Sequence, residues 1–590
     1  MKHLITLLLL ITFSVSGLAQ DRVLRPESKV KEDGNNVVIP SNIKYGNSFR
    51  GTYPNGVVIP GADNFFDYVT NGKNMSNMWV FGDTLIVAYF GADSTDPTGA
   101  TSRVAFYIVS EDGGSTWGSP NAMTTLPVRS AYPDLDPYIG GTGRNVALSG
   151  RYYAPAGSRG GAFTDAFFNL GSITATYVPN DGTDFFSHFL NGNFIGGISS
   201  ITDGGSSDTL NFWKFDVSGN SFSSPFVIVA PGADIGDNVR YHCVADESGN
   251  NIFALWWNDG SVTTDQLNYR MSSDGGSTWG AISHIMDLAG GINNMIGGDS
   301  VIPYVSNEVV FKPGTSDPYV AVTTLAPGSF SVNTSTKIAL WSPGLNGGNL
   351  VEVAGSSNMT IMSDTGLYNS IVDLQVGVVP VSHPSLGWSA DGSRLVCTFS
   401  AYQPGDTLDL FNFNDIYATY SDDNGATWSI PENITNTSDW DELYPTVAPS
   451  GNSVTKFSIH YQATRGPGSQ SFTDNAPVYR VHEIYDTYEP PVSIQNISSE
   501  IPDGFSLKQN YPNPFNPSTS IRFDIAKTSK VTLKVYDATG REVATLLNNQ
   551  EITPGTFEYN FNAESLSSGI YFYTLQSDNF RETKKMMLLK

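Results

Sequence analysis

The sequence predicts an all-β protein in which a long array of repeated small sheets precedes a short β-sandwich. Three observations support this fold class. One eight-residue turn recurs three times, residues 505–590 alternate between apolar and polar side chains, and hydrophobic residues make up 40% of the chain against only 15% charged residues. With 58 glycines available for turns, this composition is typical of a folded, β-rich protein rather than of a helical or disordered one.

The N-terminus has the pattern of a secretory signal peptide. A short basic start is followed by an apolar run from Leu4 to Phe13 and then by small residues up to Ala19. The run is too short to span a bilayer. We therefore expect a cleaved signal peptide over residues 1–19, a polar leader over residues 20–60, and no transmembrane segment once the signal is removed.

The repeated turn has the pattern Ser-x-Asp-x-Gly-x-Thr-Trp and occurs at residues 110–117, 272–279 and 421–428. Its Ser and Asp side chains can hydrogen-bond to nearby backbone groups, and its Gly tolerates a conformation that a Cβ would disfavour. Strand-forming segments precede every copy. Each copy is therefore predicted to be the tip of a β-hairpin.

This turn resembles the Asp box, or bacterial neuraminidase repeat, of sialidase-like β-propellers. The resemblance implies that the turn joins the two outer strands of a propeller blade, away from the ligand-binding face. The residues that carry it are Ser110, Asp112, Gly114, Thr116, Trp117, Ser272, Asp274, Gly276, Thr278, Trp279, Ser421, Asp423, Gly425, Thr427 and Trp428.

A second repeat, an aromatic residue or His followed by Pro, is predicted to open the inner strand of a blade. Its copies are Tyr132-Pro133, His383-Pro384 and Tyr444-Pro445, with Tyr241-His242 as a variant without Pro. Pro is tolerated at the first residue of a strand, where a ladder donor can be missing. The two repeats together predict a β-propeller over residues 61–487 with six or seven blades, seven being favoured.

A Pro-containing polar segment over residues 488–504 is predicted to be a linker, and residues 505–590 a small Ig-like β-sandwich. This tail resembles the type A C-terminal sorting domain of the type IX secretion system. The residues that carry the resemblance are Tyr511, Pro512, Asn513, Pro514 and Phe515, together with residues 535–543, 569–573 and 584–586.

The resemblance implies passage through the periplasm and export across the outer membrane. The protein would then be secreted or held at the outer cell surface, and the tail's partner would be the type IX secretion machinery. The alternative interpretation of this sandwich is a carbohydrate-binding Ig-like module.

The net charge of −25 is concentrated ahead of the tail. From Asp503 onward, 10 Lys and Arg stand against 9 Asp and Glu, so the rest of the chain carries −26. An acidic body argues against a nucleic-acid partner and against an anionic membrane surface. The two cysteines, Cys243 and Cys397, fall in different predicted blades; buried free thiols are favoured, and a disulfide stays open.

The sequence predicts no cofactor and no metal centre. The seven histidines show no metal-ligand spacing. Binding of Ca²⁺ through the carboxylates of Asp93 and Asp96, or of Asp134 and Asp136, stays open as an interpretation of two acidic loops.

The starts of the inner strands are expected to converge on the central mouth of the propeller. Aromatic and polar side chains there suit sugar or peptide ligands. The ligand-binding candidates are Tyr132, Asp134, Arg240, His242, His383 and Tyr444. We therefore expect recognition of an extracellular glycan or protein ligand, with a sialidase-like exo-glycoside hydrolase and a structural surface protein as alternatives.

Sialidase chemistry requires three arginines that hold a substrate carboxylate, a Tyr nucleophile paired with a Glu, and an Asp acid/base. Arg50, Arg240 and Arg465 are available as the cations, and Asp63 or Asp67 as the acid. None of them stands in the family's motif. The sequence therefore predicts no catalytic residue.

Overall fold

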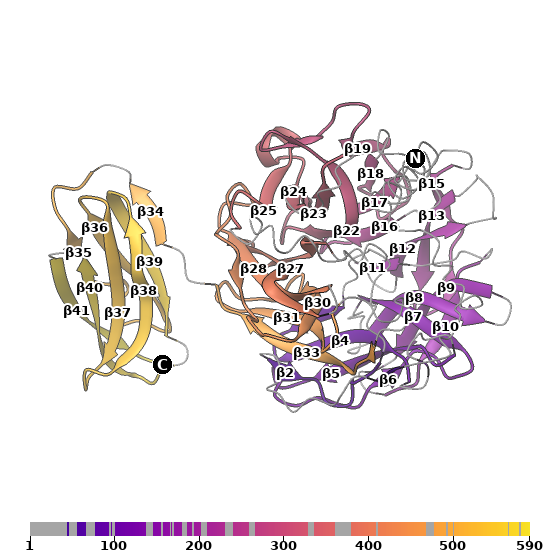
Figure 1. The fold of residues 1–590 in the computed structure, drawn as a ribbon, viewed down its shortest axis with the longest axis horizontal. Coiled ribbons are helices and arrows are strands. Elements are labelled where there is room, and N and C mark those ends of the chain that lie inside the picture. The colour runs from indigo at the N-terminus through magenta and orange to yellow at the C-terminus, as the bar shows by residue number, and fades with distance from the viewer. Residues whose placement is uncertain are drawn as a thin grey trace, which may run out of the picture. The chain divides into compact units, whose positions relative to one another are not determined.

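The computed structural model describes most of residues 56–590, together with Lys44–Tyr45 (Figure 1). The chain divides into two compact units, Met1–Tyr488 and Glu489–Lys590. The longest gaps in the description are residues 46–55, 66–76, 137–145, 180–185, 202–208, 231–239, 259–265, 328–335, 360–378 and 468–476. The predicted signal peptide, most of the leader, Arg50 and Asp67 lie outside the described residues.

In the part of the first unit that the structure describes, seven antiparallel sheets of four or five strands form a ring, and they are numbered here 1 to 7 along the chain (Figure 1). Sheet 1 contains β3 (Met78–Phe81), β4 (Thr84–Gly91), β5 (Val104–Ser110) and β6 (Asn121–Ala122). Sheet 2 contains β7 (Arg129–Asp136), β8 (Val146–Ala154), β9 (Gly157–Asp165) and β10 (Thr174–Tyr177). Sheet 3 contains β11 (Phe186–Asn191), β12 (Phe194–Ile201), β13 (Thr209–Asp216), β14 (Ser221–Phe222) and β15 (Phe226–Val229).

Sheet 4 contains β16 (Arg240–Ala245), β17 (Ile252–Asn258), β18 (Gln266–Ser272) and β19 (Ser283–Asp287). Sheet 5 contains β22 (Ile302–Phe311), β23 (Pro318–Leu325), β24 (Lys337–Trp341) and β25 (Val351–Ala354). Sheet 6 contains β26 (Val381–Trp388), β27 (Leu395–Leu408), β28 (Phe411–Ser421) and β29 (Glu432–Asn433). Sheet 7 contains β30 (Asp441–Val447), β31 (Phe457–Thr464), β33 (Val481–Tyr488) and β2 (Val57–Val58).

Two short pairs and one 3-10 turn complete the described part of this unit. They are β1 (Lys44–Tyr45) with β32 (Pro477–Val478), β20 (Met295–Ile296) with β21 (Asp299–Ser300), and η1 (Leu345–Gly348). Among the described residues, no helix is long and apolar enough to cross a membrane.

Each sheet packs its first strand against the sheet that precedes it in the ring. The strand β7 contacts β4 and β5, β26 contacts β22 to β24, and β3 contacts β31 of sheet 7. Strands at these contacts are covered on both faces, so every residue of β4, β23, β26 and β31 is buried. The all-β prediction and the propeller architecture are therefore confirmed.

The N-terminal segment closes the ring. The strand β2 is the outermost strand of sheet 7 and pairs with β33, with Val57 opposite Tyr485. Behind it, Asn64 Nδ2 donates a hydrogen bond of 3.3 Å to Glu483 Oε1, which also accepts 2.8 Å from Gln462 Nε2. The structure thus differs from the predicted boundary, because residues 57–58 of the expected leader belong to the propeller.

The three copies of the repeated turn adopt one hydrogen-bonded geometry between the third and fourth strands of sheets 1, 4 and 6. In the second copy, Asp274 accepts hydrogen bonds from Ser272 Oγ at 2.8 Å and from Thr278 Oγ1 at 2.6 Å. The backbone N–H of Gly276 donates to Ser272 Oγ at 2.8 Å. The other two copies repeat these bonds.

The turn also contacts the preceding sheet, through its glycine. Gly114, Gly276 and Gly425 have φ values between +81° and +89°, and a Cβ on each would lie within 2.4 Å of a side-chain atom. The atoms belong to Tyr485, Phe212 and Leu340, each in the sheet before. The glycine is therefore required both by backbone conformation and by close approach. In sheet 1, Trp117 adds an edge-to-face contact with Tyr485, so this turn also helps to close the ring.

The aromatic-Pro repeat does not open strands, as the sequence suggested, but lies inside the innermost strands at β-bulges. Tyr132, His383 and Tyr444 have φ values of +55° to +57°, and the strand register shifts around each. Ser306 in β22 forms a fourth bulge, without Pro. Pro fits here because the bulged residue is released from the ladder.

The bulges free backbone N–H groups that bond to the neighbouring innermost strand. The N–H of His383 donates to Ser306 Oγ at 3.1 Å, and that of Leu386 donates to Glu308 Oε2 at 2.8 Å. Glu308 is 2% exposed. Its burial raises the pKa of the carboxyl to about 8, and the nearby charge of Asp134 adds to the rise.

The second unit is a sandwich of two antiparallel sheets. One contains β34 (Ile494–Ser498), β39 (Gly555–Asn562), β36 (Ser518–Ile525) and β35 (Ser506–Leu507). The other contains β38 (Glu542–Ile552), β37 (Ser529–Asp537), β40 (Gly569–Ser577) and β41 (Phe580–Leu588). Since β34 pairs with β39, part of the expected linker belongs to the sandwich.

We predict that Asn64→Ala destabilises the closed ring. The change leaves the buried carboxylate of Glu483 with one donor fewer, which costs about 1–3 kcal/mol of the free energy of unfolding. Urea denaturation of the full chain measures the loss. The matched control is Asn349→Ala, an exposed amide that bonds only within its own turn; an equal loss in both variants would contradict a role in closure.

We predict that Glu308→Gln flattens the pH dependence of stability. The pKa of a glutamate in the unfolded chain is 4.5, and that of Glu308 in the folded protein is about 8. Between these two pH values the folded state therefore holds one proton more than the unfolded state. The free energy of unfolding therefore falls as the pH rises through this window. Gln keeps an acceptor for the N–H of Leu386 but cannot ionise. Denaturation midpoints from about pH 5 to about pH 8 test this, with the exposed Glu432→Gln as control; an unchanged slope in Glu308→Gln refutes it.

Candidate functional site

The mouth of the propeller is the end of each sheet where the first strand begins, the second ends and the third begins. Antiparallel order along the chain brings these three ends together. The repeated turns join the third and fourth strands, so they lie at the opposite end of their sheets. Side chains at the mouth are therefore the ones available to a ligand that approaches the centre of the ring.

The predicted ligand-binding residues lie on innermost strands but are mostly buried. Tyr132, Asp134, His242, His383 and Tyr444 are all at most 4% exposed. The structure brings them together in two groups: His383 packs edge-to-face on Tyr444 at 4.8 Å between ring centroids, and His242 Nε2 lies 3.9 Å from Asp134 Oδ2. The side chain of Arg240, at the start of β16, lies outside the described residues.

Three arginines that the sequence did not single out converge at the junction of sheets 1 and 2. Arg103 directly precedes β5, Arg129 begins β7, and Arg151 lies near the end of β8. The guanidinium carbons of Arg103 and Arg129 lie 4.8 and 4.6 Å from the ring centroid of Tyr153. Those of Arg103 and Arg151 lie 5.8 and 5.3 Å from that of Tyr132. We call these five residues the arginine cluster.

The cluster concentrates positive charge where little of it is hydrated. Arg103 and Arg129 are 4% and 8% exposed, whereas Arg151 is half-buried. Arg103 also donates a hydrogen bond of 2.6 Å to Tyr153 Oη. Guanidinium groups held against aromatic faces are preorganised donors with fixed fork geometry. Such an arrangement suits a planar anion, such as a carboxylate, or a sulfate group.

The loop before β5 is fixed by Asp96. Asp96 Oδ2 accepts hydrogen bonds from the N–H groups of Thr101 and Ser102, both at 2.7 Å, and from Thr101 Oγ1 at 2.8 Å. Partial burial alone would raise the pKa of Asp96, but these hydrogen bonds outweigh it and hold the pKa below its usual value. Asp96, considered above as a Ca²⁺ ligand, thus positions the loop that ends at Arg103.

The junction of sheets 6 and 7 holds two buried carboxyl groups at the same end of its sheets. Asp415 and Glu442 are 1% and 0% exposed, and burial raises the pKa of both carboxyls. Asn433 Nδ2 donates to Asp415 Oδ2 at 2.6 Å, and Thr437 Oγ1 donates to Glu442 Oε1 at 2.5 Å. The mouth therefore carries three arginines at sheets 1 and 2 and two buried carboxyl groups at sheets 6 and 7.

The remaining residues considered for catalysis have other surroundings. Arg465 Cζ lies 4.1 Å from the ring centroid of Trp440, and its Nη1 donates to the carbonyl oxygen of Asp439 at 3.2 Å. Asp63 pairs with His482 at 2.7 Å and with Arg480 at 3.3 Å, beside the ring closure. Arg465 therefore packs on Trp440, and Asp63 pairs with residues at the start of β33.

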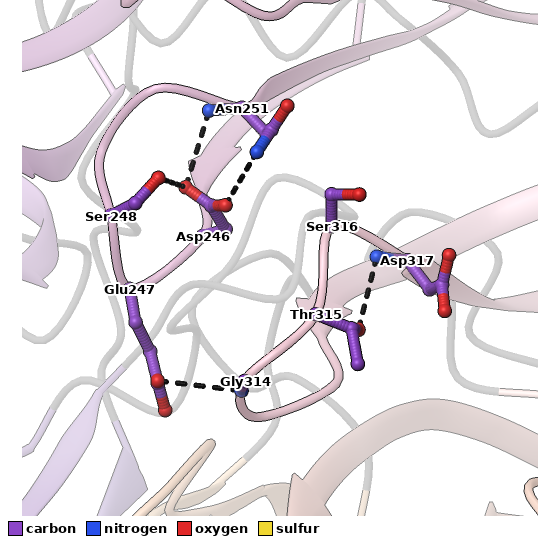
Figure 2. Close-up of a pocket in the computed structure, with 8 residues that line it drawn as sticks. All are labelled: Asp246, Glu247, Ser248, Asn251, Gly314, Thr315, Ser316 and Asp317. Carbon is purple, nitrogen blue, oxygen red and sulfur yellow. Dashed lines mark hydrogen bonds between the residues drawn. The ribbon is translucent and has the colours of Figure 1, made fainter.

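A cavity of about 530 Å³ lies at the end opposite the mouth, between the β16–β17 and β22–β23 turns (Figure 2). Its lining residues are Asp246, Glu247, Ser248, Asn251, Gly314, Thr315, Ser316 and Asp317. Asp246 accepts hydrogen bonds from Ser248 Oγ at 2.8 Å and Asn251 Nδ2 at 2.6 Å (Figure 2). These carboxylate bonds hold the turn itself. Among the described residues, no group of three or more His, Cys, Asp or Glu is arranged to hold a metal ion.

The sequence contained one signal for the arginine cluster. Arg129 stands close to the Tyr-Pro repeat and Arg151 lies in its partner strand, while Arg103 directly precedes the strand that ends in a repeated turn. All three therefore occupy strand positions near the mouth, which the two repeats define. Their convergence on Tyr132 and Tyr153 depends on the packing of sheet 2 on sheet 1, which the repeats do not specify.

Comparison with solved structures returns proteins with low identity. An ulvan lyase from a new polysaccharide lyase family is 11% identical, covering 72% of this chain and 94% of its own, with a TM-score of 0.45. An α-L-arabinofuranosidase from Fusarium graminearum is 10% identical, covering 71% and 96%, with a TM-score of 0.35. A protein of unknown function from Dyadobacter fermentans is 12% identical, covering 73% and 100%, with a TM-score of 0.34. Likeness at this level does not extend to activity, and no curated protein matches the chain.

The tail is the part of the chain whose family is recognised. Residues 509–589 match the family model of the secretion system C-terminal sorting domain. The match confirms the sorting domain predicted from Tyr511 to Phe515 and the closing strands. It assigns the protein to type IX export, with the cell surface or the extracellular space as its destination.

Proposed function

We propose that this exported propeller binds an acidic extracellular polysaccharide at its mouth, with carboxylate or sulfate groups held by the arginine cluster. The observation that carries the proposal is the convergence of Arg103, Arg129 and Arg151 on two tyrosine rings. A chain of net charge −25 would repel a polyanion over most of its surface. Three guanidinium groups gathered in one place would instead attract the anionic groups of such a ligand.

The chemistry of the cluster favours a sugar acid over a neutral sugar or a nucleic acid. Arginine binds planar oxyanions through paired N–H donors, and the buried tyrosine rings hold the guanidinium groups in place for that contact. The net charge of −25 on the whole chain would disfavour an extended array of phosphates. The sequence left a glycan or a protein as the expected ligand, and the arginine cluster favours an anionic glycan.

A second candidate function is sialidase-like hydrolysis, and the same cluster favours it. That chemistry needs three arginines around a substrate carboxylate, although they are not the arginines considered from the sequence. Turnover of a fluorogenic sialoside by the full chain distinguishes the two functions. Hydrolysis that is lost in an Arg151 variant would establish the enzyme; binding of polyanionic glycans without turnover would establish the recognition protein.

We predict that Arg151→Ala weakens binding of the full chain to soluble polyuronates or sulfated polysaccharides by roughly tenfold, because one charge-assisted contact is lost. Arg151→Lys should recover only part of the affinity, since an ammonium lacks the planar fork. Titration calorimetry at fixed ionic strength measures both.

The matched control is Arg465→Ala, which removes the same charge from another part of the mouth and should leave the affinity close to that of the wild type. Equal losses in the two variants would indicate a diffuse charge effect and contradict a site at the cluster. Absence of wild-type binding across a panel of acidic glycans at high protein concentration would refute the proposal altogether.

A further inference from the structure

The two outer faces of the tail sandwich differ in chemistry. On the sheet that contains β36 and β39, side chains that alternate with the core are polar, as expected for a solvent-facing surface. They are Ser520, Arg522, Asp524, Thr556, Glu558 and Asn560. On the sheet that contains β37, β40 and β41, the corresponding positions include aromatic and aliphatic residues.

Strand register places these apolar residues side by side. Tyr536 of β37 lies opposite Phe572 of β40, and Phe572 lies opposite Lys585 of β41. The next outward pair along β40 and β41 is Ile570 with Met587. All five alternate with buried core residues, so they are directed away from the core. Ile570 is 42% exposed, and Lys585 is exposed.

Basic side chains surround this group. Lys534 lies on the same face of β37 and pairs with Glu542 at 2.8 Å, and Arg581 lies on the same face of β41 as Lys585. Lys530 occupies an exposed outward position at the start of β37. We call the face formed by β37, β40 and β41 the basic aromatic face. It stands out in a chain whose remainder is strongly acidic.

The Pro-rich sorting motif holds one edge of this face in place. The N–H of Met587 donates to Asn513 Oδ1, and the N–H of Phe515 donates to the carbonyl oxygen of Met587, both at 3.0 Å. Phe515 is 2% exposed. The motif therefore fixes the register of β41, and with it the positions of Lys585 and Met587.

We propose that the basic aromatic face is the surface through which the tail docks on an acidic surface of the type IX export machinery. Outward apolar groups gathered on one face mark interaction sites; here Ile570 is exposed, and Tyr536, Phe572 and Met587 are half-buried. Aromatic residues, Met and Arg are also enriched in protein interfaces. The surrounding Lys and Arg select a partner rich in carboxylates. The tail is recognised as a sorting domain, so the machinery that reads such domains is the partner that this chemistry fits.

Export of the full chain in cells that carry the type IX machinery tests the proposal. The variant Phe572→Ser with Lys585→Glu should lower the ratio of extracellular to periplasmic protein by roughly tenfold. Lys527→Glu is the charge-matched control, because Lys527 is exposed in the turn between β36 and β37, outside the three strands that form this face. Its export should match that of the wild type. Equal losses in both variants, or unimpaired export of the double variant, would overturn the proposal.

A second measurement does not depend on a disruptive substitution. A photo-cross-linking phenylalanine analogue at position 572 should form an adduct with a component of the export machinery, identified by mass spectrometry. The same analogue at position 560, on the polar outer face, should not. Adducts from position 572 only with a second copy of the chain, or only with lipopolysaccharide, would show a different occupant and refute the assignment.

Discussion

Closure of the ring is the constraint on which the rest of the propeller depends. Each sheet hides its apolar faces only between two neighbours, so sheets 1 and 7 must meet. The chain achieves this by pairing β2 with β33 and by burying Glu483 among Asn64, Gln462 and His460. If this junction opened, two buried, largely apolar faces would be exposed to water at once, and the geometry of the mouth would be lost with them.

Much of this architecture could be predicted from local sequence. The hydrogen bonds of the repeated turn, such as those between Ser272 and Thr278, all form within the turn itself. Its conformation is therefore determined by eight consecutive residues. Its glycine was recognisable as a turn residue, but its contact with the preceding sheet was not. The bulges at Tyr132, His383 and Tyr444 were mistaken for strand starts, because Pro excludes a regular ladder equally well in both settings. The pairing of β2 with β33 cannot be predicted from local sequence, since the two strands lie far apart in the chain.

The candidate site was less predictable, for a physical reason. Arg103, Arg129 and Arg151 come from two sheets, and what unites them is the packing of Tyr132 and Tyr153 between those sheets. The sequence pattern of a single strand does not predict a contact between side chains of two different sheets. The aromatic residues chosen from the sequence do lie near the axis, yet packing against neighbouring strands buries them. The sorting motif differs in this respect, because Asn513 and Phe515 contact β41 within their own small domain. The family of the tail could therefore be recognised from a short segment of sequence.

Closure of the ring also protects the two cysteines from oxidation. Cys243 and Cys397 form no disulfide, are fully buried and lie in different sheets. Burial raises the pKa of the Cys397 thiol well above its usual value. A thiol that stays protonated is a poor nucleophile, so the folded protein resists the oxidants it meets outside the cytoplasm. The unfolded chain has no such protection. Whether the chain stays monomeric therefore depends on the rate of ring closure relative to the rate of thiol oxidation. Slow folding would lead to disulfide-linked aggregates.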